Sequence, residues 1–401
     1  MIKGGAARVL ATAVLVVLTA CSSGGTASHS PSPRITPSTS ASPSAVPSPS
    51  PSPSPTPVTT PVPTYATASA SCSAPIPSTA SLAVIRIGSS TTDVVADVSN
   101  PASPVTVCTL TGGNGTWQFV DRTHLSYLAY AGSDFGAATG IFELELTTNR
   151  TSVIEQQTSA GFASGKHRWS SDGNSLTYIL SDTSGVQWHL LNLSGDRLLA
   201  SFGPIPGRGG SFDDDIYLGF SPDGTMVGLA STFFGETTAK FGSTVQVRRL
   251  DGTLVYSTTP GTMGTWQNAG FYFRQDDGVH LVNGASASLA LSGIKWLRPA
   301  VSPNGEDLAF TTFDSSGLPH VSTYGHNGRS GGEIPGVRAW ATWINATTLW
   351  YEEERACTAS DNCTFTSFLP TGNHFLSNNG SAGETSTAIS LVESILPWSP
   401  R

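Results

Sequence analysis

Short apolar runs alternate with polar turns along most of the chain. The clearest example is residues 217–231, YLGFSPDGTMVGLAS, in which one apolar run enters a Ser-Pro-Asp-Gly sequence and another leaves it. Pro222 fixes φ at a value suited to entering a turn, Asp223 can bond to nearby backbone, and Gly224 tolerates a positive φ. The pattern therefore predicts a β-hairpin.

The same pattern recurs along the chain. Residues 167–181 and 298–312 repeat it closely, and degenerate copies occupy residues 116–130, 264–273 and 338–351. A period of about 35 to 50 residues, with about four strands per unit, is typical of a β-propeller. We therefore predict an all-β fold.

The two ends of the repeat region are expected to share one blade. Residues 82–87, 93–99 and 105–110 predict three strands that lack an innermost partner, and residues 393–400, ESILPWSP, resemble the start of another repeat. Pairing the two ends closes the ring and removes an exposed sheet edge. This split blade and six complete units give seven blades.

Two alternatives stay open at this stage. The unit at residues 264–293 is short and lacks the Ser-Pro-Asp-Gly turn, so a six-bladed ring is the alternative count. Residues 385–396 have some helical periodicity, so a helix there is the alternative to the closing strand.

The N-terminus has the pattern of a signal peptide. Lys3 and Arg8 precede an apolar run at residues 9–18, which is too short to span a bilayer. The following Leu-Thr-Ala-Cys, ending at Cys21, resembles the lipobox of bacterial lipoproteins, in which the cysteine is lipidated and becomes the new N-terminus. We expect residues 1–20 to be removed and Cys21 to carry the lipid; an ordinary secretory signal is the alternative.

The segment after Cys21 differs from the rest of the chain in composition. Residues 21–70 are rich in serine and proline and contain almost no large apolar residues. Such a sequence cannot form a core and favours extended, disordered chain. We expect it to be a stalk, and residues 71–401 to be the propeller domain.

The other four cysteines fit an exported protein, because disulfides persist in oxidising compartments. Four thiols allow three pairings. We predict Cys72 with Cys108 and Cys357 with Cys363; free buried thiols are the alternative.

The charge and the motifs of the chain argue against several classes of function. Only 12% of residues are charged, the formal net charge is −8, and no basic run is present. Nucleic-acid binding is therefore not expected. The chain has no Cys-x-x-Cys and no histidine pair at ligand spacing, so we predict no metal site and no cofactor. No catalytic residue is nominated.

The repeats resemble the WD-like propeller repeats of the TolB family, which also occur beside the catalytic domain of prolyl oligopeptidase-type peptidases. The resemblance covers most of residues 82–400. It implies the propeller fold but not a function, because such repeats serve binding proteins and enzymes alike. Two departures from this family are expected: the stalk takes the place of the α/β domain that precedes the propeller in TolB, and no peptidase domain is expected after the repeats.

One face of the ring is expected to bind a ligand. In each blade, the connection from second to third strand and the connection to the next blade emerge on the same face, which we call the long-loop face, because the longest predicted loops lie there. Long loops on a rigid scaffold commonly carry binding residues. The candidates are Phe135, Asp213, Asp214, Asp215, Phe233, Phe234, Glu236, Glu352, Glu353 and Glu354.

These features predict a lipid-anchored propeller, exposed on the extracytoplasmic side of a cell membrane, that binds a protein or an envelope polymer. We expect a monomer. The alternative is an envelope hydrolase or lyase whose active site lies where the central channel opens, since paired carboxyl groups can hydrolyse glycosides.

Overall fold

The chain divides into two units, Met1–Thr59 and Thr60–Arg401. The computed structural model describes only residues of the second unit, in the ranges 64–113, 116–131, 138–156, 166–182, 185–202, 216–234, 240–325, 331–358, 360–361, 368–377 and 384–395. All regular structure in these ranges is β-strand, apart from isolated turns and bends.

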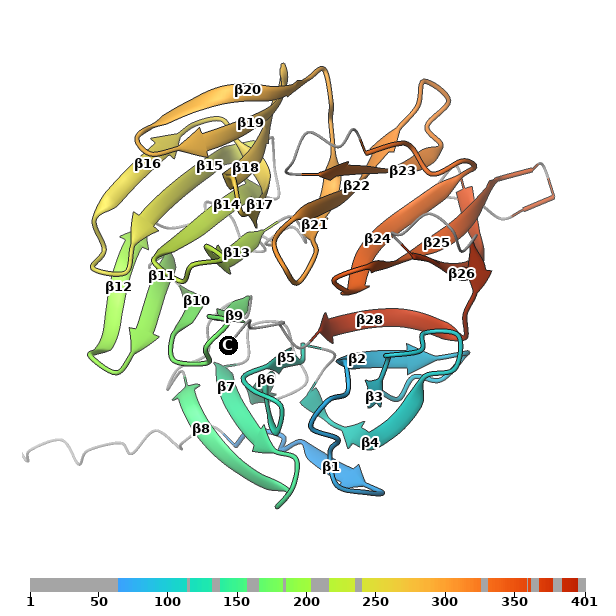
Figure 1. Ribbon diagram of the computed structural model, residues 1–401. Helices are drawn as coiled ribbons and strands as arrows, with labels where there is room; N and C mark the ends of the chain where they lie inside the picture. Colours follow the sequence, from blue (N-terminus) through green and yellow to red (C-terminus); the bar gives the residue numbers. More distant parts are fainter. Residues whose placement is uncertain are drawn as a thin grey trace, which may run out of the picture. The chain divides into compact units, whose positions relative to one another are not determined.

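The described strands form seven sheets arranged as the blades of a propeller (Figure 1). Blade 1 contains, from the centre outward, β28 (Ile389–Ile395), β2 (Leu82–Ile87), β3 (Val94–Asp97), β4 (Val105–Thr111) and β1 (Ser69–Cys72). Blade 2 contains β5 (Gln118–Phe119), β6 (His124–Ala131), β7 (Ala138–Glu145) and β8 (Arg150–Gln156). Blade 3 contains β9 (His167–Trp169), β10 (Leu176–Asp182), β11 (Gly185–Asn192) and β12 (Gly195–Ser201).

The remaining four blades follow in chain order. Blade 4 contains β13 (Tyr217–Phe220), β14 (Met226–Phe234), β15 (Lys240–Arg249) and β16 (Leu254–Thr258). Blade 5 contains β17 (Thr262–Gln267), β18 (Gly270–Gln275), β19 (Gly278–Asn283) and β20 (Ser286–Ser292). Blade 6 contains β21 (Leu297–Val301), β22 (Asp307–Phe313) and β23 (Pro319–Gly325). Blade 7 contains β24 (Arg338–Asn345), β25 (Thr348–Ala356), β26 (Phe368–Ser377) and β27 (Thr385–Ser386).

The ring closes between the two ends of the chain, as predicted. β28 pairs with β2 in antiparallel register, from Ala83 opposite Ile395 to Ile87 opposite Ile389. The closing strand therefore begins four residues before the predicted segment 393–400, and residues 396–401 lie outside the described ranges. The helix considered for residues 385–396 is wrong, because β27 and β28 occupy most of that stretch.

The blade count is seven. The short unit at residues 264–293 forms a complete four-stranded sheet, β17 to β20, so the six-bladed alternative is wrong. Among the described residues, blade 6 has three strands, and an isolated bridge between Ser322 and Glu333 lies in its fourth position. The innermost strands of consecutive blades contact one another all the way around the ring.

Blade 1 has a fifth strand that the sequence pattern did not indicate. β1 pairs with the outer edge of β4, with Cys72 opposite Cys108, and these two residues form the predicted disulfide. The folded part begins earlier than the predicted boundary at residue 71, because Ala68 is buried and Tyr65 packs against the core. We call residues 64–72 the N-terminal strap.

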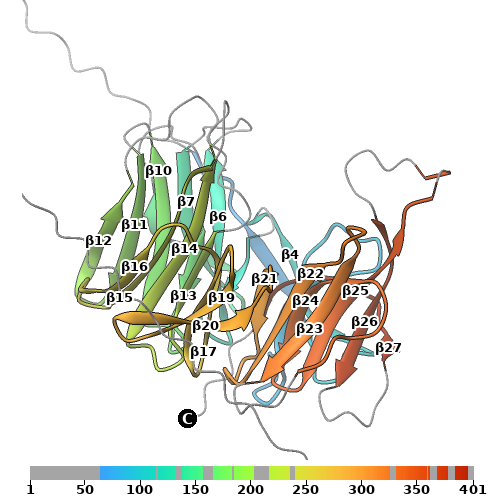
Figure 2. The same cartoon turned by 90° about the horizontal axis from the view of Figure 1, so that it is seen from above.

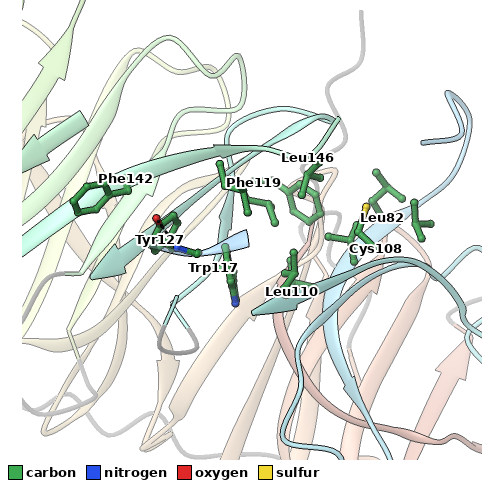
Figure 3. Packing of buried hydrophobic residues seen from close by; sticks show 14 of the residues in the cluster. Leu82, Cys108, Leu110, Trp117, Phe119, Tyr127, Phe142 and Leu146 are labelled. Atoms are coloured by element: carbon green, nitrogen blue, oxygen red, sulfur yellow. Dashed lines mark hydrogen bonds between the residues drawn. The ribbon is translucent and has the colours of Figure 1, made fainter. Parts of the chain in front are cut away.

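The largest core cluster lies between blades 1 and 2 (Figure 3). Leu82 and Leu110 come from blade 1, and Tyr127 and Phe142 from blade 2. Trp117 lies between them with no exposed surface, and its indole N–H donates to Asp93 (3.1 Å). Each blade face is covered by the next blade, which explains why the second strands are apolar on both sides.

Burial falls from the centre to the rim of each blade. The second strand β6 is buried at five consecutive positions, whereas the fourth strands β8 and β20 are mostly exposed. A strand that is covered by neighbouring blades on both faces needs a continuous apolar run, and a rim strand does not. Figure 2 shows the strands of several blades running side by side from one face of the propeller to the other.

The repeated turn is organised by its serine. The backbone N–H of Met226 donates to Ser221 Oγ (2.9 Å), and this hydroxyl donates to Asp223 (2.6 Å). Gly224 has a φ of 68°, as the turn requires. The same hydroxyl position is occupied by the buried residues Ser170 and Ser302 in blades 3 and 6. The turn thus satisfies its own buried backbone groups.

Candidate functional site

The structure describes only part of the predicted ligand face. Phe135, Asp213, Asp214, Asp215 and Glu236 lie outside the described residues, as do Cys21 and Cys363. Phe233 and Phe234 end β14, where their backbone pairs with β15, but their side chains are not described. Cys357 is disulfide-bonded. The three glutamates of β25 are therefore the predicted candidates whose surroundings can be analysed.

These glutamates do not form one acidic patch. Successive residues of a strand point to opposite faces of the sheet. Glu353 lies on the face of Tyr351, which packs toward blade 6, and Glu352 and Glu354 lie on the face of Trp350, which packs toward blade 1. The predicted cluster is thus divided between two blade interfaces.

Glu352 and Glu354 form a coupled carboxyl pair. Glu354 is only 5% exposed, and burial, then the charge of Glu352 and a hydrogen bond with it, raise the pKa of Glu354 to about 7. Burial also raises the pKa of Glu352, while its hydrogen bond with Glu354 and the nearby charge of Arg298 oppose that rise. The arrangement corresponds to a protonated Glu354 donating to an ionised Glu352.

Glu353 belongs to a closed ring of four charged or titratable groups. Arg338 Nη1 is 3.1 Å from Glu353, and Arg338 Nη2 is 3.0 Å from Glu384. His374 contacts the same two carboxylates, at 3.0 Å and 3.2 Å. The Arg338 guanidinium also lies over the ring of Tyr351, 5.8 Å from its centroid. This network joins β24, β25, β26 and the residue before β27.

The innermost strands of blades 5, 6 and 7 share an irregularity near their first residues. The register with the second strand shifts between Thr262 and Thr265, between Leu297 and Ala300, and between Ala339 and Thr342. Each bulge contains one non-glycine residue with positive φ: Met263 (52°), Arg298 (43°) or Trp340 (56°). Such conformations cost about 1–3 kcal/mol each and are common at binding sites, where a bulge redirects a side chain.

Two of these bulges bring their side chains together. The guanidinium of Arg298, on β21, lies over the indole of Trp340, on β24, 4.3 Å from the ring centroid. Arg298 is exposed and Trp340 is half-buried. Both residues lie where the innermost strand enters its blade, which is the long-loop face. Here a cation and an aromatic ring are held on rigid strands.

A second aromatic pair lies on the same face. Phe313 ends the second strand of blade 6, and Phe368 begins the third strand of blade 7; their ring centroids are 5.9 Å apart. Phe313 is 39% exposed although it is a large apolar residue. The hairpin of β25 and β26 continues beyond the pairing of β24, which ends at Arg338 opposite Glu353. The described part of the long-loop face is thus aromatic over blades 6 and 7.

The described cavities lie toward the opposite face. One, of about 490 Å³, lies between blades 4 and 5 and is lined by turn residues such as Asp223, Asn268 and Asn283. The other, of about 400 Å³, lies between blades 6 and 7 and is lined by Trp343, Tyr351 and Glu384, among others. The prediction placed all candidate residues on the long-loop face and did not anticipate these cavities.

The described residues were compared with what a metal site, a membrane-spanning helix and a glycosidase site require. Within them, no group of three or more histidine, cysteine, aspartate or glutamate side chains could hold a metal ion. No helix in those ranges could span a membrane. The carboxyl groups of Glu352 and Glu354 share a hydrogen bond, so they are closer than the 5 Å or more that separates the carboxyl groups of glycosidases, about 5–9.5 Å.

Arg298 and Trp340 were missed by sequence reasoning. Each lies at the start of a repeat unit that the pattern did locate, at residues 298 and 338. A bulge shifts the inward and outward positions of a strand by one, and nothing in the apolar pattern marks where this happens. A large side chain at the first residues of a repeat was the only available signal.

Comparisons with known proteins give structural resemblances only. No protein-family model and no curated protein matches the sequence. The β-propeller domain of the Trilobed protease from Pyrococcus furiosus is 9% identical, with a TM-score of 0.45, over 67% of this chain and 81% of that chain. TolB from Acinetobacter baumannii is 12% identical, with a TM-score of 0.38, over 65% of this chain and 63% of that chain. Oligogalacturonate lyase from Vibrio parahaemolyticus is 11% identical, with a TM-score of 0.45, over 76% of this chain and 84% of that chain. The strand order of the chain itself establishes the propeller.

Proposed function

We propose that this chain is a binding module of the cell envelope, held to a membrane through Cys21 and a flexible stalk. The signal peptide, the lipobox and the Ser/Pro-rich segment support this address. The disulfide between Cys72 and Cys108 agrees with it, because such bonds persist outside the reducing cytosol.

The ligand is a protein or an envelope polymer that contacts the long-loop face at blades 6 and 7. The observation that carries this proposal is the exposed Arg298 guanidinium, fixed over Trp340 by two adjacent bulges. Arginine and aromatic side chains on a rigid base lose little entropy on binding and are enriched at the centres of interfaces. Phe313 and Phe368 extend the same surface.

Site-specific photo-crosslinking in intact cells tests this assignment. A photoreactive residue at Arg298 or at Phe313 should give a cross-linked product, because both positions lie on the long-loop face. A photoreactive residue at Leu193, which is 95% exposed on the opposite edge of blade 3, is the matched control. Products from Leu193 but from neither of the other positions would contradict the proposed face.

An envelope hydrolase or lyase is the second candidate, and one observation favours it. The pKa of Glu354, about 7, would let this carboxyl act as a general acid near neutral pH. Its 5% exposure counts against direct contact with a substrate. Glu354→Gln should abolish any release of soluble fragments from envelope polysaccharide if this candidate is right; unchanged release would exclude Glu354 as the acid.

A further inference from the structure

The innermost strands of the ring carry more positive than negative charge. Their charged residues, histidine aside, are three arginines, Arg168 on β9, Arg298 on β21 and Arg338 on β24, and one acidic residue, Glu393 on β28. The whole chain contains 28 acidic and 20 basic residues, so this balance is the reverse of the overall one. Arg338 is already paired with two carboxylates. Arg298 belongs to the long-loop face, which leaves Arg168 to be explained.

The Arg168 side chain extends toward the centre of the ring. It starts from β9 in blade 3, and its Nη1 donates to Oε1 of Gln118 on β5 in blade 2 (2.5 Å). It also lies close enough to Tyr217, on β13 of blade 4, for the two groups to interact electrostatically. A side chain that meets the innermost strands of both neighbouring blades lies where those strands converge, around the central axis (Figure 1).

Arg168 is reached by water although protein surrounds it. The residue is exposed, yet burial lowers the pKa of its guanidinium. Both observations hold for a group that lines an opening inside the ring, because such a group touches water but has lost most of its hydration shell. The guanidinium stays charged at neutral pH, since its ordinary pKa is so high. A ligand can therefore reach a fixed positive charge here.

Most hydrogen-bond donors of this site have no acceptor. A guanidinium carries five N–H donors. Within the described residues, Gln118 Oε1 is the only acceptor that the Arg168 side chain meets, and no carboxylate forms an ion pair with it. Because Gln118 uses its oxygen to accept from Arg168, its half-buried amide offers the NH₂ group to any further partner. The site thus presents donors beside a positive charge.

We propose that Arg168 and Gln118 form an anion-binding site at the centre of the ring, which takes a carboxylate or phosphate group of a ligand. The planar fork of the guanidinium donates to two oxygens of such a group, and the Gln118 amide donates to one of them. The ligand supplies the counter-ion that the described residues do not provide. Blades 2 and 3 build this site and blades 6 and 7 build the surface of Arg298 and Trp340, so either proposal can fail alone.

Thermal unfolding of the full-length protein measures anion binding, since a ligand that binds only the folded state raises the midpoint. The probes are inorganic phosphate and acetate, each compared with chloride at equal ionic strength so that screening is constant. We expect at least one probe to raise the midpoint; a response to phosphate alone indicates a phosphate-bearing ligand, and a response to acetate indicates a carboxylate.

Variants of the two residues test whether the response comes from this site. Arg168→Gln should weaken binding of the probe about tenfold or more, because a charge-assisted pair is lost. Arg168→Lys should have an intermediate effect, since an ammonium group keeps the charge but lacks the fork. Arg298→Gln is the matched control, the same change on the innermost strand of blade 6, and should leave the response unchanged.

Gln118→Glu gives Arg168 a counter-ion from within the chain. This variant should raise the midpoint in chloride and remove the response to both probes, so the test does not depend on how well Arg168→Gln folds. The Arg168 Nε–H signal in ¹H–¹⁵N spectra, identified by its loss in Arg168→Lys, should shift when the probe is added. No response to either probe, an undiminished response in Arg168→Gln or Gln118→Glu, or shifts only at other arginines would overturn the proposal.

Discussion

Glu354 should make the stability of the propeller depend on pH in an unusual direction. This carboxyl is 5% exposed between blades 7 and 1, and burial together with Glu352 raises its pKa from 4.5 to about 7. Most acidic groups stabilise a fold when they ionise, because their pKa falls on folding. Glu354 does the opposite, and Glu354→Gln is the change that removes the effect.

The sign and size follow from proton linkage. Between about pH 4.5 and 7 the unfolded chain loses the proton of Glu354 while the folded chain keeps it, so the contribution of this group to stability falls as pH rises. Below that window both states are protonated, and above it the loss is complete. A difference of about 2.5 pKa units corresponds to about 3 kcal/mol in total.

Urea unfolding of both proteins, followed by circular dichroism at several pH values from 4.5 to 8, measures this contribution. The free energy of unfolding of Glu354→Gln minus that of the wild type should rise by about 3 kcal/mol across the range, and taking the difference removes groups common to both. Glu352→Gln should move the fall to lower pH, since the charge of Glu352 helps to raise the pKa of Glu354. A difference that does not change with pH would refute the reasoning.

Other changes test the fold and the anchor. Ser221→Ala should destabilise by about 1 kcal/mol in urea unfolding, because it leaves the part-buried N–H of Met226 without its acceptor. Cys72→Ser opens a loop with a sequence separation of 36 and should cost about 4 kcal/mol in the chain-entropy model; a change under 1 kcal/mol would contradict that model here. Deleting β28 should lower the thermal midpoint of the whole domain, not only fray one blade, whereas an unchanged midpoint would mean that closure is unimportant. Cys21→Ser should release the protein from the membrane fraction, and retention of a processed variant would contradict lipidation.

The periodic part of the fold could be predicted from sequence, and the irregular part could not. Alternating apolar runs and Ser-Pro-Asp-Gly turns locate the repeats because a repeated local geometry needs a repeated local sequence. Strand β1 could not be predicted, because its sequence SASC at Ser69–Cys72 contains no large apolar residue. It is held to β4 by backbone pairing and a disulfide. Blade 5 lacks the motif, yet it is complete, since Trp266 and Phe271 fill its core.

The arrangement of the acidic candidates on β25 could not be predicted from sequence, for a physical reason. Acidic residues that are adjacent in the sequence suggest one acidic patch. Successive residues of a strand point to opposite faces, however, so Glu353 lies on one face of the sheet and Glu352 on the other. The contact between Arg298 and Trp340 joins residues 42 positions apart through two bulges, and such a pairing exists only after both blades have formed.

The N-terminal strap also determines how the domain carries a mechanical load. A pull on the chain ahead of Ser69 reaches Cys72 and passes through the disulfide directly to Cys108 on β4. The intervening stretch, which contains β2 and β3, is bypassed by the tension. In the proposed anchored form, the seam at which β2 and β28 close the ring therefore lies off the covalent path of a force applied from the N-terminal side.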